Sequence, residues 1–213
     1  TTLFRSLFFA TARRGGARVV PVDSEHSAIF QCLPEDARLK IGNFNLKDQG
    51  VQKLILTGSG GPLREVPLEE LPKVTPAKAL AHPIWSMGPK ITVDSATMMN
   101  KGLEFIEARL LFCAAPGDID IVIHPQAVVH SMVAYRDGAV LAQMSTPDMR
   151  LPIQYALSYP LRLPLPYERL DFSKYSCLTF EKPDREVFPC LDMAYKASAA
   201  GGGMPCVMNE IGR

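Results

Sequence analysis

The chain has 213 residues, of which 47% are hydrophobic, and its formal net charge at pH 7 is +1. This length and composition are typical of a globular protein with one large domain or two small ones. A nearly neutral chain with no apolar run of roughly 18 residues is not expected to bind nucleic acid or to cross a membrane.

The first half of the chain alternates short apolar runs with polar turns. RVVPV (18–22) and KLILT (53–57) are β-branched runs that predict strands, and SAIFQCL (27–33) has the apolar face of a helix. We expect HPIWSM (82–87) to be a loop, and KITVDSA (90–96) to run from a strand into a turn.

The second half predicts a helix, three strands and a linker. NKGLEFIEARLLF (100–112) has a helical period, DIDIVIH (118–124) alternates like a strand, and 130–144 reads as a hairpin turning at Asp137-Gly138. Prolines are frequent after about residue 158 and indicate an ordered linker. After the linker we expect a helix, a glycine-rich break and the start of a second helix. We therefore predict an α/β (α+β) fold, with a mixed sheet covered by helices.

Two carboxylates follow the first predicted strand. Residues two apart in a strand point to the same side, so Asp23 and Glu25 can converge on a hard divalent cation. The alternative is that Asp23 or Ser24 caps the helix of 27–33. The D-x-E spacing alone favours the cap.

Two further polar stretches suit an anion. The glycines of T-G-S-G-G-P (57–62) let backbone N–H groups converge on an oxyanion, with Ser59 as a further donor, although a plain tight turn fits equally well. In a helix starting near Asn100, Lys101 and Glu104 lie near one face, where they offer a phosphate contact and a third carboxylate. An ordinary surface Lys–Glu pair is the simpler interpretation of that spacing, and Ser95 could be a cap.

The order of these motifs decides between the alternatives. PVDSEHSAIFQ, LTGSGGPLRE, HPIWSMGPKITVDSATMMNKGLE and IHPQAVVHSMV occur in sequence. Together they resemble the 1-deoxy-D-xylulose 5-phosphate reductoisomerase family, over about residues 7 to 210.

The resemblance implies a role for each matching residue. It makes Asp23, Glu25 and Glu104 the ligands of a divalent metal, Mn²⁺ or Mg²⁺ with Co²⁺ as a further option. The residues implied to hold the phosphate and hydroxyls of a phosphosugar substrate are Ser59, Ser95, Asn100 and Lys101, with Ser24 beside the metal. His82, Trp85 and Met87 match a loop that closes over the substrate, Met87 and Gly88 match contacts to NADPH, and His130 and Met149 match residues near the closed pocket. Glu25, Lys101, Glu104 and His82 are the implied catalytic residues.

The implied reaction is the NADPH-dependent rearrangement and reduction of 1-deoxy-D-xylulose 5-phosphate to 2-C-methyl-D-erythritol 4-phosphate, in isoprenoid biosynthesis. The rearrangement expected from the resemblance is a retroaldol cleavage and re-aldolisation at the metal. The family is a homodimer, and we expect its shared sheet to contain 53–57, 90–94, 118–124 and the hairpin of 130–144. Five cysteines without a C-x-x-C pair favour a reducing compartment, either the bacterial cytoplasm or, in a plant, the plastid stroma.

The resemblance also divides the chain. We expect residues 1–22 to end the NADPH-binding domain, 23–158 to form the catalytic domain, 159–185 to be the linker, and 186–213 to start a C-terminal helical domain. No G-x-G-x-x-G fingerprint occurs, so we interpret the chain as a fragment of the family. A non-enzymatic metal- and phosphate-binding fragment is therefore the alternative function, and a phosphosugar isomerase without redox chemistry is a third. We expect His124 to be structural and Met98 and Met99 to be packing residues. For Trp85, the alternative to a role in the substrate loop is an ordinary core position.

Overall fold

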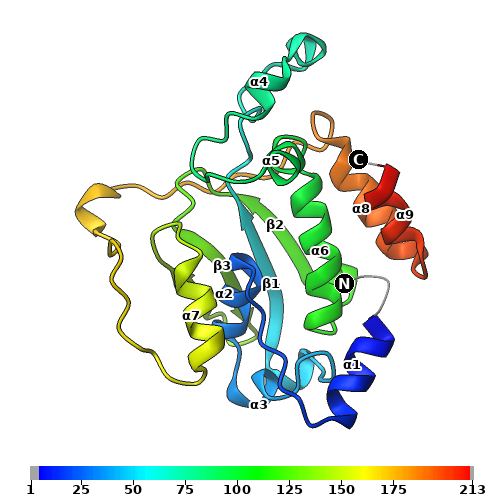
Figure 1. The fold of residues 1–213 in the computed structure, drawn as a ribbon, viewed down its shortest axis with the longest axis vertical. Coiled ribbons are helices and arrows are strands. Elements are labelled where there is room, and N and C mark those ends of the chain that lie inside the picture. Colours follow the sequence, from blue (N-terminus) through cyan, green and yellow to red (C-terminus); the bar gives the residue numbers. More distant parts are fainter. Residues whose placement is uncertain (1–4, 212–213) are drawn as a thin grey trace.

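The structure is a computed structural model that describes residues 5–211 (Figure 1). Its centre is a mixed sheet with the strand order β2-β1-β3-β4. Strand β1 (Val51–Gly58) is parallel to β2 (Ile119–Ile123) and antiparallel to β3 (Val129–Tyr135). β3 pairs in turn with the edge strand β4 (Val140–Met144), which confirms the predicted α/β class.

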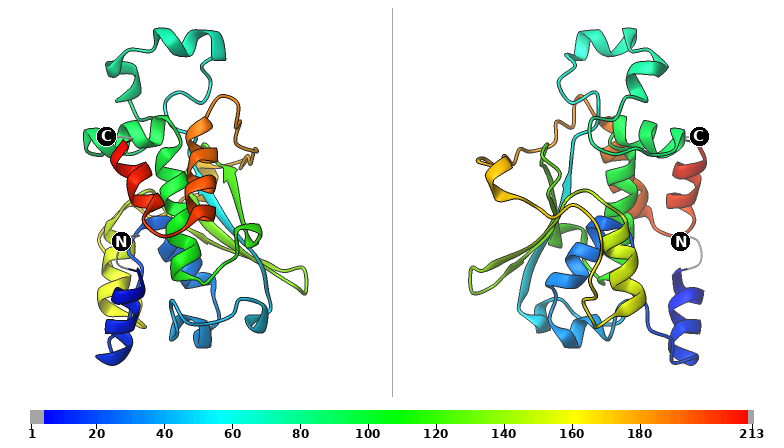
Figure 2. Two further views of the ribbon diagram at one scale, coloured as in Figure 1. Left: turned by 90° about the vertical axis from the view of Figure 1, so that its right-hand side faces the viewer. Right: turned by 60° about the vertical axis from the view of Figure 1, so that its left-hand side comes forward.

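Helices cover the apolar face of this sheet. Leu54 and Leu56 of β1 are fully buried, and they pair in register with Ile119 and Ile121 of β2. Helix α2 (Ser24–Cys32) contacts β1, β3 and β4, and α6 (Met99–Leu111) contacts β1. Figure 2 shows both helices on one side of the sheet and the β3–β4 hairpin projecting beyond them. The alternation of buried and exposed positions thus orients the sheet toward α2 and α6.

The remaining helices surround this centre. α4 projects from the top of the molecule, α8 lies beside α6, and α9 lies beside α8 (Figures 1 and 2). Their bounds are α1 (Arg5–Arg14), α3 (Glu35–Arg38), α4 (Pro76–Ala79), α5 (Pro89–Ala96), α7 (Arg150–Ser158), α8 (Pro189–Ala200) and α9 (Met204–Ile211). Short 3-10 turns occupy Lys47–Gln49, Leu68–Lys73, Pro116–Asp118 and Phe172–Lys174. Within residues 5–211, no helix is both long enough and apolar enough to serve as a membrane span.

Most predicted elements occur where the periodicity indicated. KLILT lies in β1 and DIDIVIH contains β2, while the hairpin forms with its turn at 136–139. The helix expected from residue 100 begins at Met99, and the one expected from residue 27 begins three residues earlier, at Ser24. HPIWSM is a loop as expected.

Two strand predictions were wrong. RVVPV (18–22) has no regular secondary structure, no strand of the described chain pairs with it, and Pro21 has no N–H to donate to a ladder. KITVDSA is helix α5, so it is not part of the sheet. Pro89 begins this helix in the first-turn position that suits proline, and Lys90 bonds Asp94 one turn later at 2.6 Å. These two local features outweigh the β-branched composition.

The segment after α7 is irregular, as a linker should be, although the predicted domain boundaries stay a prediction. It returns to the sheet where Glu181 forms a β-bridge with Ile123. His124 is fully buried there, with Nδ1 3.0 Å from the carbonyl oxygen of Thr179 and Nε2 accepting from the N–H of Val128 at 3.3 Å. His124 is therefore a structural residue, as expected.

Close helix packing joins α6 to α8. Gly102 of α6 faces Ala194 of α8, and a Cβ atom on Gly102 would lie 2.5 Å from the Ala194 Cβ. Further along, the Arg109 guanidinium donates to the carbonyl oxygen of Ser198 at 2.9 Å. Helix α8 is thus packed against the same helix that carries Lys101 and Glu104.

Replacing Gly102 by alanine should destabilise the chain. A glycine-to-alanine change in an open helix usually raises stability by up to about 1 kcal/mol, but here the added methyl group forces α8 away. We expect the free energy of unfolding, measured with urea, to fall by about 1–3 kcal/mol. Gly117→Ala is the control, since nothing lies within 4 Å of its added Cβ. Equal effects of the two substitutions would contradict this account of α6–α8 packing.

Candidate metal and anion site

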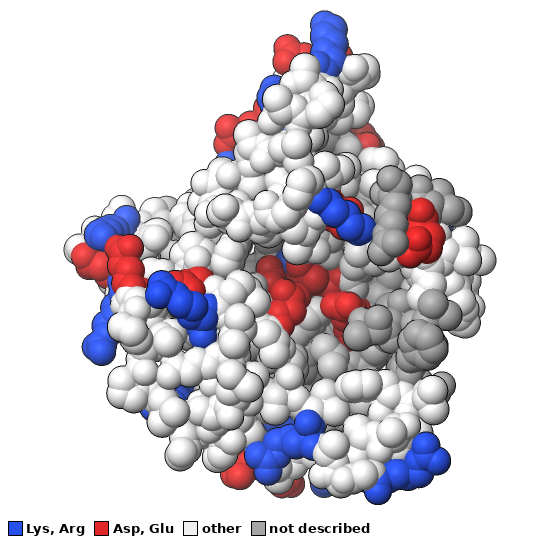
Figure 3. All heavy atoms as spheres, viewed as in Figure 1, with Lys and Arg blue, Asp and Glu red and all other residues white. Residues whose placement is uncertain are grey.

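A cavity of about 240 Å³ opens where β1, α2, α5 and α6 meet. The parallel pair β1 and β2 ends at this edge of the sheet, and α2 and α6 both begin there. Its lining includes almost every predicted site residue: Asp23, Ser24, Glu25, Ser59, His82, Trp85, Met87, Ser95, Asn100, Lys101, Glu104 and Met149. In Figure 3, acidic side chains gather in a hollow near the middle of the visible face.

Asp23 and Glu25 converge for a different reason from the one the sequence suggested. Asp23 is the N-cap of α2, where its carboxylate accepts from the N–H of Ser24 at 3.0 Å, and Glu25 lies in the first helical turn. The predicted strand geometry was therefore wrong, and the alternative cap is confirmed. The cap nevertheless leaves both carboxylates at the cavity, because the start of a helix attracts negative charge.

The third carboxylate comes from α6. Met98, the N-cap of α6, has left-handed backbone angles (φ 62°, ψ 8°), which turn the chain sharply after α5. As a result, Ser95 near the end of α5 and Asn100, Lys101 and Glu104 near the start of α6 reach the same cavity. A left-handed non-glycine residue costs of order 1–2 kcal/mol, so the surrounding packing must hold this turn.

Lys101 and Glu104 are not a surface pair. The side chains of Lys101 and Glu104 are only 7% and 4% exposed. The Lys101 ammonium donates to Glu25 Oε1 at 2.9 Å and also to Glu104 Oε2. One buried cation therefore bridges carboxylates from two helices.

The other oxygens of these carboxylates have donors too. Ser24 Oγ donates to Glu25 Oε2 at 2.6 Å, and Asn100 Nδ2 donates to Glu104 Oε1 at 2.6 Å. Burial raises the pKa of Glu104 well above its usual range, and repulsion from Glu25 adds to this while Lys101 opposes it. Burial disfavours the Lys101 charge, but attraction from Glu104 and Glu25 outweighs it and raises the pKa of Lys101. The negative charge of this site is thus only partly compensated.

The three carboxylates fit a hard divalent cation. Asp23, Glu25 and Glu104 each present an oxygen, and these atoms lie within 4.8 Å of one another. Oxygen-only donors that remain partly open are the set that Mg²⁺ and Mn²⁺ prefer. Burial, together with the neighbouring Glu25 carboxylate, raises the pKa of Glu104, and a cation at this point would favour its ionised form.

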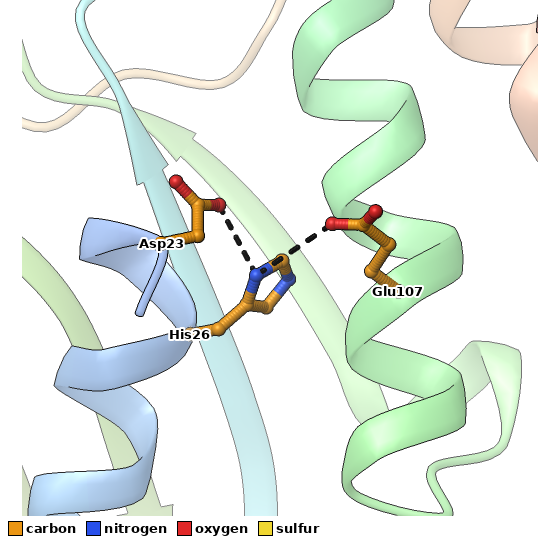
Figure 4. A group of neighbouring side chains, drawn as sticks. All are labelled: Asp23, His26 and Glu107. Atoms are coloured by element: carbon orange, nitrogen blue, oxygen red, sulfur yellow. Dashed lines mark ion pairs between the residues drawn. The ribbon is translucent and has the colours of Figure 1, made fainter. Parts of the chain in front are cut away.

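His26 connects the two helices that carry the three carboxylates (Figure 4). It is 1% exposed, its Nδ1 lies 3.1 Å from Asp23 Oδ2 and 3.8 Å from Glu107 Oε2, and its Nε2 donates to the backbone carbonyl of Glu104 at 3.0 Å. Burial opposes the charged ring, yet its bond to Asp23 and the nearby Glu104 and Glu107 carboxylates raise the pKa of His26 to about 9. His26 therefore stabilises the Asp23 carboxylate as a cation. The same contacts help to lower the pKa of Asp23 against its own burial.

Ser59 and His82 form the opposite wall. His82 Nδ1 accepts from the N–H groups of Ile84 at 3.1 Å and Trp85 at 2.9 Å, so the ring proton resides on Nε2. Burial lowers the pKa of His82, which favours this neutral form. Nε2 then donates to Ser59 Oγ at 3.2 Å, and Ser59 also accepts from the N–H of Gly61 at 3.2 Å. The Ser59 hydroxyl proton is left to donate to a ligand.

Sequence reasoning missed some residues of this region and assigned others that lie at its margin. Gly88 caps α5 and His130 is buried against Ser145, but neither lines the cavity, although the Trp85 and His130 rings are 6.4 Å apart. Met98 lines it as well as packing in the core, so the expectation of packing alone was incomplete. His26 and Glu107 had a detectable signal, because each lies three residues after a predicted ligand on a helix.

Comparisons with known proteins identify the family of this chain. Two family models match, one described as the 1-deoxy-D-xylulose 5-phosphate reductoisomerase C-terminal domain at residues 19–112, the other as the DXP reductoisomerase C-terminal domain at residues 144–211. Enzymes named 1-deoxy-D-xylulose 5-phosphate reductoisomerase from Idiomarina loihiensis and Shewanella amazonensis are each 55% identical over 203 residues, or 95% of this chain. The chain belongs to the 1-deoxy-D-xylulose 5-phosphate reductoisomerase family.

Solved reductoisomerase structures share the fold. A DOX-P reductoisomerase in complex with NADPH, fosmidomycin and magnesium superposes with a TM-score of 0.93 at 43% identity, covering 98% of this chain and 51% of that one. The Zymomonas mobilis reductoisomerase in complex with NADPH gives 0.85 at 46% identity, covering 96% and 50%. The chain spans about half the length of the curated reductoisomerases it matches, 51% in each case.

The charge on His26 should make the stability of the metal-free reductoisomerase chain depend on pH. Its pKa rises from 6.5 to about 9 on folding, so its stabilising effect is complete below 6.5 and is lost as the pH rises through about 9. We expect the wild type to have a larger free energy of unfolding than His26→Gln, measured with urea in the presence of EDTA. This difference should shrink by at most roughly 3 kcal/mol as the pH rises across this window. A difference that stays constant with pH would mean that His26 is neutral in the folded chain.

Proposed function

We propose that this chain carries the metal and substrate pocket of a reductoisomerase that converts 1-deoxy-D-xylulose 5-phosphate into 2-C-methyl-D-erythritol 4-phosphate. The supporting observation is one cavity that joins three convergent carboxylates to a set of hydroxyl, amide and ammonium donors. Family membership and the presence of NADPH and magnesium in structures of similar proteins support the same conclusion. The reaction belongs to non-mevalonate isoprenoid biosynthesis.

Asp23, Glu25 and Glu104 would hold Mg²⁺ or Mn²⁺, with Co²⁺ as a further option. When bound, the cation polarises the substrate oxygens as a Lewis acid, and NADPH supplies the hydride. His26 keeps Asp23 ionised and oriented for this purpose, and the N-terminus of α2 stabilises Asp23 and Glu25 as anions. These contacts prepare the ligands before any cation arrives.

Ser59, Ser95, Asn100 and Lys101 would hold the phosphate, with Ser24 as a contact beside the metal. They come from the end of β1, the last turn of α5 and the first turns of α2 and α6, so a bound anion would connect four elements. Binding energy gained at the remote phosphate can orient the reacting carbons near the cation.

The loop of residues 82–88 would close over the substrate. Trp85 and Met87 line the cavity from this loop, and His82 anchors its beginning through Ser59. Closure would exclude water and bring Met87 and Gly88 toward a nicotinamide.

A non-enzymatic metal- and phosphate-binding module remains the second candidate. One observation favours it: within residues 5–211, the resemblance assigns only Met87 and Gly88 to the dinucleotide, and Gly88 does not line the cavity. Loss of NADPH absorbance on adding 1-deoxy-D-xylulose 5-phosphate and Mn²⁺ distinguishes the two. A metal-dependent isomerase would form product without consuming NADPH.

We further propose a homodimer formed through the sheet, located in the bacterial cytoplasm. β4 is an edge strand, and Val140 and Leu141 are 53% and 50% exposed on it, which suits pairing with a second copy. None of the five cysteines, all of which lie within residues 5–211, forms a disulfide in the structure, which suits a reducing compartment.

Glu104→Gln should remove metal binding, and with it any metal-dependent NADPH consumption. Even outer partners of metal ligands contribute about tenfold to hundredfold to affinity, so losing a ligand should weaken Mn²⁺ binding at least about a hundredfold. Free Mn²⁺ measured by electron paramagnetic resonance reports the affinity directly. Glu107→Gln is the matched control, because Glu107 belongs to the neighbouring cluster with Asp23 and His26. A larger loss in Glu107→Gln than in Glu104→Gln would assign the cation to that other cluster.

Lys101→Ala should weaken binding of phosphate-bearing ligands. A charge-assisted hydrogen bond contributes about 1.5–3 kcal/mol, so the dissociation constant or Michaelis constant should rise about tenfold to hundredfold. Calorimetric titration with the substrate, alongside steady-state assays where turnover is present, measures both. An unchanged affinity together with unchanged turnover would remove Lys101 from the anion site.

A further inference from the structure

The donors assigned to the substrate are already bonded to the carboxylates assigned to the metal. Lys101 donates to both Glu25 and Glu104, and Ser24 and Asn100 donate to the remaining oxygen of Glu25 and of Glu104 respectively. All four carboxylate oxygens of Glu25 and Glu104 therefore have a protein donor. The donors on one side of the cavity and the carboxylates on the other thus satisfy each other's hydrogen bonds.

A divalent cation cannot simply be added to this arrangement. The metal would sit among oxygens that lie within 4.8 Å of one another, and the Lys101 ammonium is 2.9 Å from one of the Glu25 oxygens. An ammonium and a divalent cation held about 4 Å apart repel by several kcal/mol at the effective dielectric of a protein. Ammonium and metal therefore compete for the same carboxylates.

The alternative position for the ammonium lies on the anion side of the cavity. The Lys101 stem passes over the end of β1, where a Cβ on Gly58 would lie 2.8 Å from Lys101 Cε and 3.6 Å from Nζ. Gly58 directly precedes Ser59, whose hydroxyl proton is left to donate. A lysine has four flexible carbons and three donors, so a small rotation can redirect its charge.

We propose that Lys101 is an exchangeable counter-ion, bound to Glu25 and Glu104 when the metal is absent and released to the phosphate of the ligand when the metal binds. This inference rests on the proposed function, because it assumes that both sites exist as assigned. Ser24 and Asn100 are released from the carboxylates in the same exchange. Cation binding thus creates the donor set that the anion requires.

Such an exchange makes the two binding events cooperative. An anion that captures Lys101 removes the competitor of the metal, and the metal frees the donor for the anion, so each must tighten the other by the same factor. Coupling of this type usually lies between about fivefold and 150-fold. A lysine that keeps its bonds to the carboxylates would give no coupling.

The test measures Mn²⁺ affinity of the purified chain with and without inorganic phosphate. Free Mn²⁺ is read by electron paramagnetic resonance, and protein-free titrations correct for Mn²⁺ bound by phosphate itself. We expect phosphate to lower the Mn²⁺ dissociation constant at least about fivefold in the wild type. This measurement requires no variant, so it does not depend on the folding of a mutant.

Lys101→Met identifies the residue responsible. Without the competing ammonium, Mn²⁺ should bind about tenfold more tightly in the absence of phosphate, and phosphate should no longer change its affinity. Lys90→Met is the matched control, because Lys90 pairs with Asp94 on α5 and its side chain is 48% exposed. It removes the same charge without touching Glu25 or Glu104, and it should keep the wild-type coupling.

Two results would overturn the proposal. In the first, the wild type binds Mn²⁺ and Asp23→Asn does not, but phosphate leaves the wild-type affinity for Mn²⁺ unchanged. This result would support the metal site and reject the exchange of Lys101. Coupling that persists in Lys101→Met would also reject it. If Mn²⁺ does not bind to the wild type at all, the proposed function itself fails, and that outcome is distinct from the other two.

Discussion

The buried ammonium of Lys101 is the interaction on which the rest of this site depends. Glu25 lies in the first turn of α2 and Glu104 lies on α6, and the lysine between them is the charge that lets both acids remain inside the protein. Desolvated charges are stable only when they are paired and hydrogen-bonded, so removing one member leaves the others costly. The relative position of α2 and α6 is therefore fixed by electrostatics as well as by packing. His26, which bonds an atom from each helix, reinforces the same arrangement.

The fold supplies the scaffold for this charge cluster in a simple way. A parallel strand pair ends where two helices begin, so backbone N–H groups and carboxylates meet at one edge of the sheet. Glycine at position 58 gives the Lys101 stem the space to cross the end of β1. The apolar wall of Trp85, Met87 and Met98 then limits contact with water, which strengthens every ionic interaction inside.

Some of this was accessible from the sequence, and some was not. KLILT and the hairpin were predictable because period-two patterns and a D-G turn are local signals, and the metal carboxylates were assigned through motif order. The helical state of KITVDSA was not, because β-branched residues outnumbered the weaker signal of Pro89 and the Lys90–Asp94 spacing. Asp23 and Glu25 were paired for the wrong geometric reason, since a cap and a strand give the same spacing. The left-handed turn at Met98 has no sequence signal, as glycine is its usual residue.

Helix α6 affects more than the pocket, because one of its faces lines the cavity and another packs against α8. Lys101 and Glu104 face the cavity. On the other side, Gly102 packs so closely against α8 that a Cβ atom would not fit, and the Arg109 guanidinium donates a hydrogen bond to α8. If α6 moves as a rigid helix, a displacement of α8 also moves the side chains of α6 that line the cavity. Residues 189–200 are thus mechanically part of the site although none of them lines it. Substitutions in α8 should therefore change ligand affinity as well as the free energy of unfolding.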